Sequence, residues 1–233
     1  MFKLLSTANP KIQKGTKMGY LSFILHLAPA TLSGKETCPK RTAGCTAACL
    51  NTAGRGGMFR KGENTNMIQK ARIRKTNYFF NDRAGFMADL VSDINKAIKF
   101  AAKQGLTPVF RLNGTSDLSW EKYEAAYGKN IFELFDYVQF YDYTKVLGRK
   151  VKHLKNYHLT FSKADGNDAD VAEALMQGMS VVAVYDQIPE GVPSADETDL
   201  RFLDPKGIML GLKAKGRAKK DYSGFVIRLT EVA

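Results

Sequence analysis

Cysteine is scarce in this sequence of 233 residues: there are only three, and all of them lie between residues 37 and 49. An odd number of thiols so close together excludes a closed disulfide framework. Histidine is equally scarce, with His26, His153 and His158 as the only examples. Few other side chains can therefore complete a soft-metal site, and the three thiols are the first candidates for a functional centre.

Long apolar runs are also missing. The longest, Leu21 to Ala30, is too short to span a bilayer and is interrupted by Ser22 and His26. The N-terminus lacks the long apolar core of a signal peptide. Clustered thiols without an export signal predict a cytoplasmic protein in a reducing environment, with no membrane partner.

Acidic residues are the third shortage, with 23 Asp and Glu against 35 Lys and Arg, a net charge of +12 and a pI near 9.5. This excess favours phosphate-bearing partners such as nucleic acid, or else it is a solvated basic surface that binds nothing in particular. No Ser–His–Asp pattern or P-loop is present, which argues against hydrolases and nucleotidases. The chain length and the hydrophobic content of 44% predict one domain over residues 1–233, and the alternation of strands and helices described below makes it an α/β domain.

The three cysteines are Cys38, Cys45 and Cys49. If residues 43–51 are helical, Cys45 and Cys49 share one helix face, and the preceding loop can fold Cys38 back toward it. Three converging thiolates select zinc, Cu(I) or an iron–sulfur cluster. Zinc needs a fourth ligand, for which His26 is the nearest in sequence, whereas a cubane cluster on three cysteines leaves one iron open. The remaining alternative is three reduced cysteines that bind nothing.

Strand and helix patterns alternate along the rest of the chain. Residues 1–18 carry scattered lysines and are expected to be an irregular basic segment. Strands are expected at 19–28, 107–113, 137–143, 157–162, 179–185, 207–212 and 224–229, and helices at 64–80, 85–104, 119–135 and 168–178. This alternation implies parallel pairing with right-handed crossovers, either in a partial (β/α)6 TIM-like barrel or in an open, doubly wound sheet.

Polar residues recur where the predicted strands end, which favours the partial barrel, because barrel enzymes carry their chemistry at the carboxyl ends of strands. These residues lie at 113–117, 142–145, 162–163 and 186–187. We expect the mouth of the barrel to be lined by Arg111, Asn113, Asp117, Lys145 and Lys163.

Two groups of residues near this mouth have alternative interpretations. Asp117 either orients a ligand or caps a helix before Ser119. The glycines Gly54, Gly56 and Gly57, which follow the last cysteine, either allow a ligand to approach the backbone closely or form a helix stop and turn.

This order of features resembles the radical S-adenosylmethionine (SAM) enzymes, whose partial six-stranded barrel carries a three-cysteine cluster loop after its first strand. The spacing here is Cys38-x6-Cys45-x3-Cys49, whereas the usual pattern is C-x3-C-x2-C. The resemblance implies a 4Fe-4S cluster on the three cysteines, whose open iron binds SAM. The residues that would bind SAM or a polar substrate are Arg111, Asn113, Asp117, Gly54, Gly56 and Gly57, and the catalytic candidates are Asp117, Lys145 and Lys163.

A second resemblance is closer in sequence. Segments 26–29, 45–57, 111–117 and 141–145 are similar to little-characterised bacteriophage proteins of the gene-product-88-like kind, as are 199–201, 211–213 and 221–225. This resemblance implies the same architecture and a phage origin, so that the cytoplasm would be that of the host cell.

Two functions compete. The first is an iron–sulfur protein of radical-SAM-like architecture, a SAM-dependent enzyme that acts on a polar or nucleic-acid-related substrate. The alternative is a non-enzymatic nucleic-acid-binding protein whose zinc or iron–sulfur site is structural. The alternative depends on three basic stretches, 60–75, 145–155 and 213–220. Aromatic residues near the first two either stack on bases or belong to the core; they are Tyr78, Phe79, Phe80, Tyr141 and Tyr143.

Overall fold

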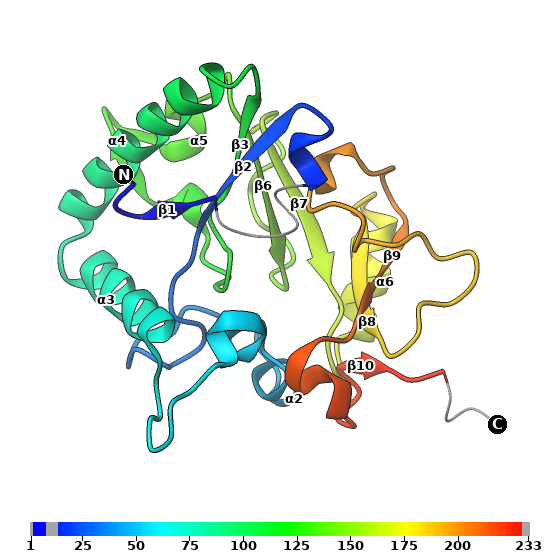
Figure 1. Cartoon of the computed structure of the whole chain (residues 1–233). Helices are drawn as coiled ribbons and strands as arrows, with labels where there is room; N and C mark the ends of the chain where they lie inside the picture. Colours follow the sequence, from blue (N-terminus) through cyan, green and yellow to red (C-terminus); the bar gives the residue numbers. More distant parts are fainter. Residues whose placement is uncertain (1, 8–13, 230–233) are drawn as a thin grey trace.

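A mostly parallel sheet organises the residues that the computed structural model describes, 2–7 and 14–229 (Figure 1). Its strands are β1 (Leu5–Ser6), β2 (Tyr20–Leu25), β3 (Thr107–Arg111), β6 (Gln139–Thr144), β7 (Tyr157–Ser162), β8 (Val181–Tyr185), β9 (Met209–Lys213) and β10 (Val226–Ile227). From β2 to β9, spatial neighbours follow chain order and pair in parallel. In a doubly wound sheet the strand order reverses at one point, whereas here it does not reverse between β2 and β9.

The sheet is open in the described residues, and the barrel closure that the predicted partial barrel implies is not found. Its first edge is β1, which pairs antiparallel with β2, and its last full strand is β9, which pairs with β8. Within the described ranges these two edges do not pair with each other. The segment 1–18, expected to be irregular, thus holds the strand β1; residues 1 and 8–13 of that segment lie outside the described residues.

β10 occupies a fork between β7 and β8. On one side of β8, Val181 and Val182 pair with β7, whereas Val184 and Tyr185 pair with β10. The other side of β8 pairs with β9 along its whole length. The chain therefore brings its C-terminal segment to the carboxyl end of the sheet.

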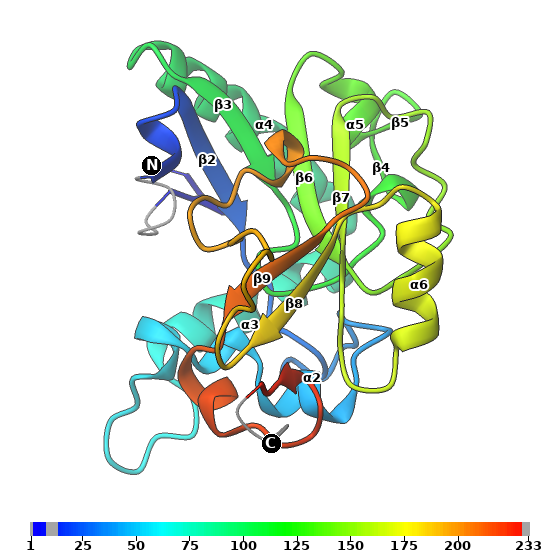
Figure 2. The ribbon, with the colours of Figure 1, turned by 90° about the vertical axis from the view of Figure 1, so that its right-hand side faces the viewer.

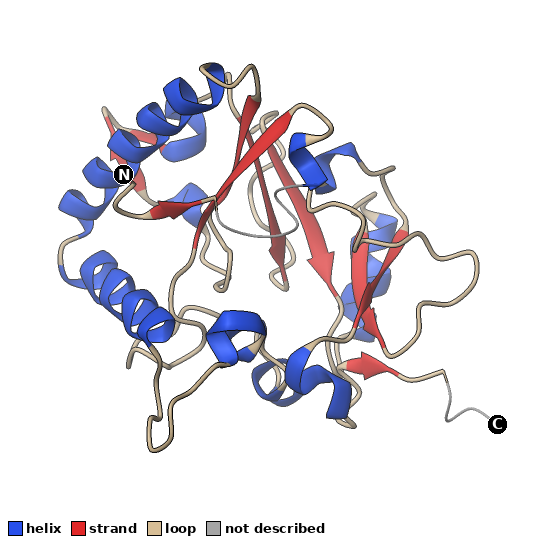
Figure 3. Ribbon diagram, viewed as in Figure 1, coloured by secondary structure: helices blue, strands red, loops and turns tan. Residues whose placement is uncertain are grey.

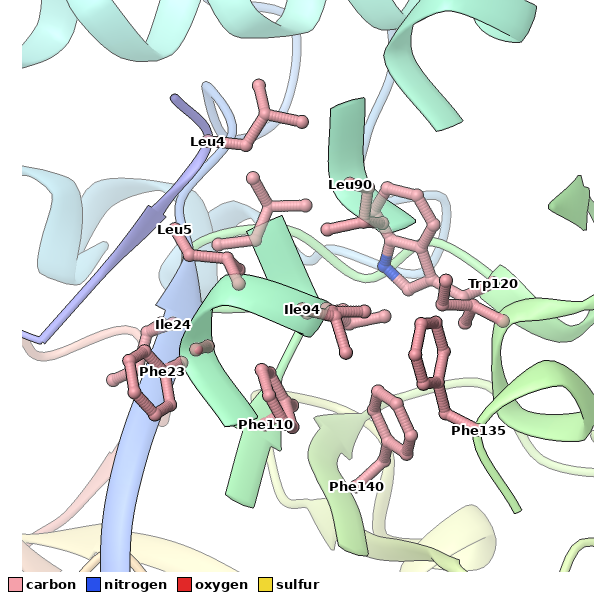
Figure 4. Close-up of a cluster of buried hydrophobic side chains, with 14 of the residues drawn as sticks. Leu4, Leu5, Phe23, Ile24, Leu90, Ile94, Phe110, Trp120, Phe135 and Phe140 are labelled. Atoms are coloured by element: carbon pink, nitrogen blue, oxygen red, sulfur yellow. The ribbon is translucent and has the colours of Figure 1, made fainter. Parts of the chain in front are cut away.

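Helices cover one face of the sheet (Figure 3). They are α3 (Met67–Asn81), α4 (Arg83–Ala102), α5 (Ile131–Leu134) and α6 (Asp168–Met176). In α4 the apolar residues Phe86, Leu90, Ile94, Ala97 and Ala101 recur at helical spacing and are fully buried. Figure 4 shows Ile94 near the sheet residues Phe110 and Phe140, and Leu90 beside Trp120. All four helices use this face, which agrees with a strand order that never reverses.

The helix predicted over residues 119–135 is wrong. This stretch forms a short 3-10 turn, η3 (Trp120–Lys122), a hairpin of β4 (Glu124–Ala126) and β5 (Lys129–Asn130), and then α5. Tyr127 and Gly128 have φ values of 56° and 71°, and two left-handed residues in a row make the tight turn that hairpins require. Asn130 then starts α5 with a capping box, in which Glu133 is its partner.

The opposite face of the sheet is covered by one segment, residues 186–206, which contains the 3-10 turn η4 (Arg201–Leu203) (Figures 1 and 2). At one end Ala195 donates its N–H to the carbonyl of Gly211 in β9, at 2.7 Å. Further along, Leu200 packs against Val109 and Tyr141. The segment thus fills the side of the sheet where a barrel would have its interior. No helix in the described ranges is long and apolar enough to cross a membrane.

Candidate metal centre

The cysteine segment, residues 26–62, begins where β2 ends. Cys38 lies in a loop, Cys45 lies in the short helix α2 (Ala43–Ala47), and Cys49 lies just beyond that helix, before the 3-10 turn η1 (Leu50–Thr52). The helix expected over 43–51 is therefore shorter than predicted. The chain turns at Cys49 because its sulfur accepts the N–H of Asn51, at 3.5 Å, which starts η1.

All three cysteines line one cavity of about 280 Å³. The other lining residues are Pro29, Ala30, Thr31, Leu32, Arg41, Thr46, Asn51 and Thr52, so His26 is not among them. Within the described ranges, no group of three or more His, Cys, Asp or Glu side chains is arranged to hold a single metal ion. The predicted convergence of three sulfurs on one ion is therefore not found, although the three thiols share one cavity.

The surroundings of Cys38 and Cys49 favour the protonated form of these two thiols. Burial raises the pKa of Cys38 to about 11, against hydrogen bonds from the Ala30 N–H (3.4 Å) and the Thr37 hydroxyl. Burial also raises the pKa of Cys49, whereas the charges of Lys145 and Arg72 lower it. A bound metal would supply the positive charge that turns these thiols into thiolates.

Asp165, in the turn after β7, holds α2 in place. Its carboxylate accepts hydrogen bonds from the Thr42 hydroxyl and from the N–H groups of Gly44 (3.0 Å) and Cys45 (3.2 Å). Burial opposes the charge, but these hydrogen bonds prevail and lower the pKa of Asp165. At Gly44 a Cβ atom would overlap Ser223 and the Asp165 carboxylate, so this contact requires glycine. Sequence reasoning missed Asp165, although it lies two residues after the predicted site residue Lys163.

Asn113, predicted to bind a cofactor, instead shapes the loop after β3. Its side chain is 2% exposed. Its amide nitrogen donates to the Leu118 carbonyl at 2.9 Å, and its amide oxygen accepts from Ser116, from the Leu118 N–H and from the Trp120 indole. The amide group is therefore fully used inside the protein.

Asp117, predicted to orient a ligand or to cap a helix, joins three strand ends. Its N–H donates to the Thr37 carbonyl in the cysteine loop, and its carboxylate accepts the Lys145 N–H after β6, both at 2.8 Å. The Lys145 ammonium donates to the hydroxyl of Ser162, at the end of β7, at 3.3 Å. The carboxyl ends of these strands therefore meet beside the cysteine loop, and Figure 1 shows the arrowheads of β6 and β7 pointing toward the side of the sheet where α2 lies.

Arg111 and Lys163 are engaged elsewhere. Arg111 pairs with Asp199 at 3.0 Å and lies over the Tyr143 ring at 4.5 Å, on the face covered by residues 186–206. Lys163 pairs with Asp168, at the start of α6, at 2.8 Å. Neither side chain lines the cysteine cavity.

The three glycines predicted to admit a ligand lie in the 3-10 turn η2 (Gly54–Gly57) and do not line the cavity either. A Cβ atom at Gly56 would lie 2.5 Å from the Asn51 carbonyl, and one at Gly57 would overlap the Thr52 carbonyl. Gly54 has a φ of 55°, which favours glycine. Tight packing of this turn on the preceding one therefore accounts for Gly56 and Gly57, and the backbone conformation accounts for Gly54.

The family model described as gene product 88 matches residues 3–229. Comparison with curated proteins and with solved structures finds no match.

Proposed function

We propose that this chain, which belongs to the gene product 88 family, is an iron–sulfur protein whose 4Fe-4S cluster is bound by Cys38, Cys45 and Cys49. The observation that carries the proposal is that all three cysteines of the chain line one cavity beside the carboxyl ends of parallel strands. A cluster suits thiols spread around a cavity, because each thiolate binds a different iron. A zinc ion instead needs four ligands at about 2.0–2.3 Å from one point.

The chain supplies what a cluster site needs besides thiols. Backbone N–H groups of Ala30 and Asn51 point at the sulfurs of Cys38 and Cys49. Hydrogen bonds to ligand sulfurs tune the reduction potential of such centres. Lys145 and Arg72 favour the thiolate of Cys49. In this proposal the N–H groups of Ala30 and Asn51 position the sulfurs, and Lys145 and Arg72 balance the thiolate charge. A cluster held by three cysteines leaves one iron open to a small ligand.

The finer architecture of the proposal is a radical-SAM-like partial barrel in a bacteriophage protein of the host cytoplasm. Two observations support the barrel part: the parallel strands follow chain order, and the cysteine loop leaves the first of them. The side chains expected to bind SAM do not support a SAM site, because Asn113 and Arg111 are engaged inside the protein. SAM therefore enters the proposal only as a ligand to be tested.

The test is to purify the protein without oxygen and to measure its visible spectrum and its iron, sulfide and zinc content. We expect brown protein with broad absorption and matching iron and sulfide. Colourless protein with one zinc per chain would replace the cluster by a structural metal. Protein that stays metal-free after anaerobic incubation with iron and sulfide would overturn the proposal. Adding SAM to the reduced protein should change its electron paramagnetic resonance spectrum if SAM binds the open iron.

The second candidate function is non-enzymatic binding of nucleic acid, with zinc or a cluster as a structural staple. The observation that favours it is the position of the basic 3-10 turn η5 (Gly216–Lys220), which packs against the cysteine segment. The aromatic residues near the other two basic stretches give less support, because Phe79 and Tyr141 are fully buried and cannot stack on bases.

A further inference from the structure

Two segments, one that carries the cysteines and one that packs against it, contain positive charge without any negative charge. Residues 37–62 include five Lys and Arg and no Asp or Glu, and residues 213–220 likewise include five and none. Other stretches share this property, such as residues 143–164 with six Lys and Arg and no Asp or Glu, so it is their place in the fold that distinguishes these two segments. All three cysteines lie within the first of these two segments.

The fold places these two segments side by side. Ala48 of the cysteine segment forms a buried cluster with Ala214 and Ala218. A Cβ atom at Gly216 would lie 3.3 Å from the Cβ of Ala53, so the two turns touch. Figures 1 and 2 both show the orange-red turn of residues 216–220 beside the cyan turn of the cysteine segment. Their charges therefore form one surface, which we call the basic rim, residues 37–62 and 213–220.

The cations of the basic rim face solvent. Ala214 and Ala218 turn inward, and they leave Arg217, Lys219 and Lys220 exposed. On the other segment Arg55, Arg60 and Lys61 are exposed, and Arg41 lines the cavity itself.

Neighbouring carboxylates neutralise only part of the basic rim. Glu36 pairs with Arg41, and Asp196 pairs with Lys215. Asp165 caps α2, and Asp221 accepts hydrogen bonds from Ser223 and from the Val226 N–H. The exposed cations of the turn η5 and of residues 55–61 therefore remain available to an external polyanion.

Apolar side chains are exposed among these cations. Leu50 is 57% exposed, Met58 70% and Phe59 38%. Cations beside exposed apolar and aromatic groups are the combination that binds single strands, because unpaired bases offer their faces for packing while the phosphates meet Lys and Arg. A duplex hides those faces, so it would use the cations alone.

We infer that the basic rim binds single-stranded nucleic acid across the mouth of the cysteine cavity. The evidence that the basic rim binds nucleic acid is its charge and the packing of its two segments. The further step, that nucleic acid is the substrate class of the metal centre, rests on the proposed function. Arg41 belongs to the rim and lines the cavity together with the three cysteines, so a strand bound along the rim would pass beside that cavity.

The experiment measures fluorescence anisotropy of a labelled, mixed-sequence DNA strand of about 20 nucleotides with the full chain, over a range of salt. The test variant combines Arg217→Ala, Lys219→Ala and Lys220→Ala. At about 0.1 M salt it should bind about tenfold more weakly, and the slope of log K against log salt should shrink by about two. A second variant, Arg55→Ala with Arg60→Ala and Lys61→Ala, tests the other segment independently if the first does not fold.

The matched control removes three exposed lysines at the other end of the sheet, near the amino ends of β3 and β9, by Lys99→Ala, Lys103→Ala and Lys206→Ala. It should bind like the wild type. The inference would be overturned if the wild type did not bind at low salt, or if the control variant lost as much affinity as the test variant. It would also be overturned if duplex DNA bound as tightly as the single strand. Polyglutamate that competed as well as unlabelled single-stranded DNA would indicate an acidic protein partner instead. Iron content is measured on the same samples, so that failure of the cluster and failure of the rim are read separately.

Discussion

Asp142, at the end of β6, carries a completely buried carboxyl group. One of its oxygens accepts the Asn113 N–H at 2.7 Å, and the other accepts the Tyr157 hydroxyl at 3.1 Å. Burial raises its pKa from 3.8 to about 7, although Arg111, Asn113, Arg149 and Tyr157 all act in the opposite direction. The folded protein therefore holds a proton on Asp142 at pH values where the unfolded chain has lost it.

This proton predicts a pH dependence of stability. Between about pH 4 and pH 7 the folded state binds one more proton than the unfolded state. The contribution of Asp142 to the free energy of unfolding therefore falls by about 1.4 kcal/mol per pH unit as pH rises. Asp142→Asn keeps the shape of the side chain and should remove this slope. Urea unfolding of both proteins at several pH values measures it.

The difference in free energy of unfolding between the wild type and Asp142→Asn separates the effect of Asp142 from that of the histidines. His26 and His158 have lowered pKa values, about 3 and about 4, so they destabilise both proteins as pH falls below about 6.5. The control is Asp136→Asn, at an exposed carboxylate. Parallel stability curves for wild type and Asp142→Asn from pH 4 to pH 7 would contradict the prediction.

The three thiols give the second prediction at this scale. Cys38→Ala, Cys45→Ala and Cys49→Ala should each abolish iron incorporation, because two thiolates are too few to hold a cubane cluster. Iron and sulfide analysis after anaerobic purification is the measurement. Thr46→Ala, on the same helix and lining the same cavity, should keep its iron. Full iron content in any one cysteine variant would remove that cysteine from the ligand set.

Among the elements, α2 depends most on a distant residue. With only five residues it is too short to be stable alone. Its N-terminal N–H groups are satisfied by Asp165, from the turn after β7, and by its own N-cap Thr42. A carboxylate at this end also interacts favourably with the exposed N–H dipoles.

Asp165→Ala should therefore lower the free energy of unfolding by about 1–2 kcal/mol and reduce iron content, since α2 carries Cys45. Chemical denaturation and iron analysis measure the two effects. Asp168→Ala is the control, because the Asp168 side chain is 75% exposed and should change stability by no more than about 0.5 kcal/mol. Equal behaviour of the two variants would show that Asp165 does not support the cysteine loop.

In the molecule as a whole, residues 186–206 connect the outer strand to the middle of the sheet, whereas in a closed barrel pairing between the edge strands connects them. Their hydrogen bond to β9 and the packing of Leu200 on Val109 and Tyr141 join the outer strand to the middle of the sheet. Asp199 is the polar centre of this contact, because it accepts from Arg111 and from the hydroxyls of Tyr141 and Tyr143.

Asp199→Ala should cost about 3 kcal/mol or more, because it leaves the guanidinium of Arg111 buried without its partner. Urea unfolding measures the loss. Arg111→Met combined with Asp199→Leu should recover most of it, since no uncompensated charge then remains. Glu197→Ala, at an exposed position of the same segment, is the control. If Asp199→Ala is as stable as this control, the ion pair does not hold the segment on the sheet.

Periodic patterns were sufficient for most elements. The spacing of Phe86, Leu90 and Ile94 located α4 to within two residues at each end, and β7 has the predicted boundaries. The parallel sheet followed from the alternation of strands and helices, and the clustering of the cysteines is visible without any structure. These features depend on neighbours within a few residues, which the sequence displays directly.

The partners of the polar residues could not be read in this way. Gly44 and Asp165 are 121 residues apart, and Arg111 and Asp199 are 88 apart, yet each pair is joined by hydrogen bonds. Nothing periodic marks such a pair, so Asn113 and Arg111 were predicted to bind a cofactor although both are used inside the protein. The packing of residues 213–220 against residues 37–62 could not be read from the sequence either. Tertiary packing decided these contacts, because a side chain's free partners depend on which distant segment is folded against it.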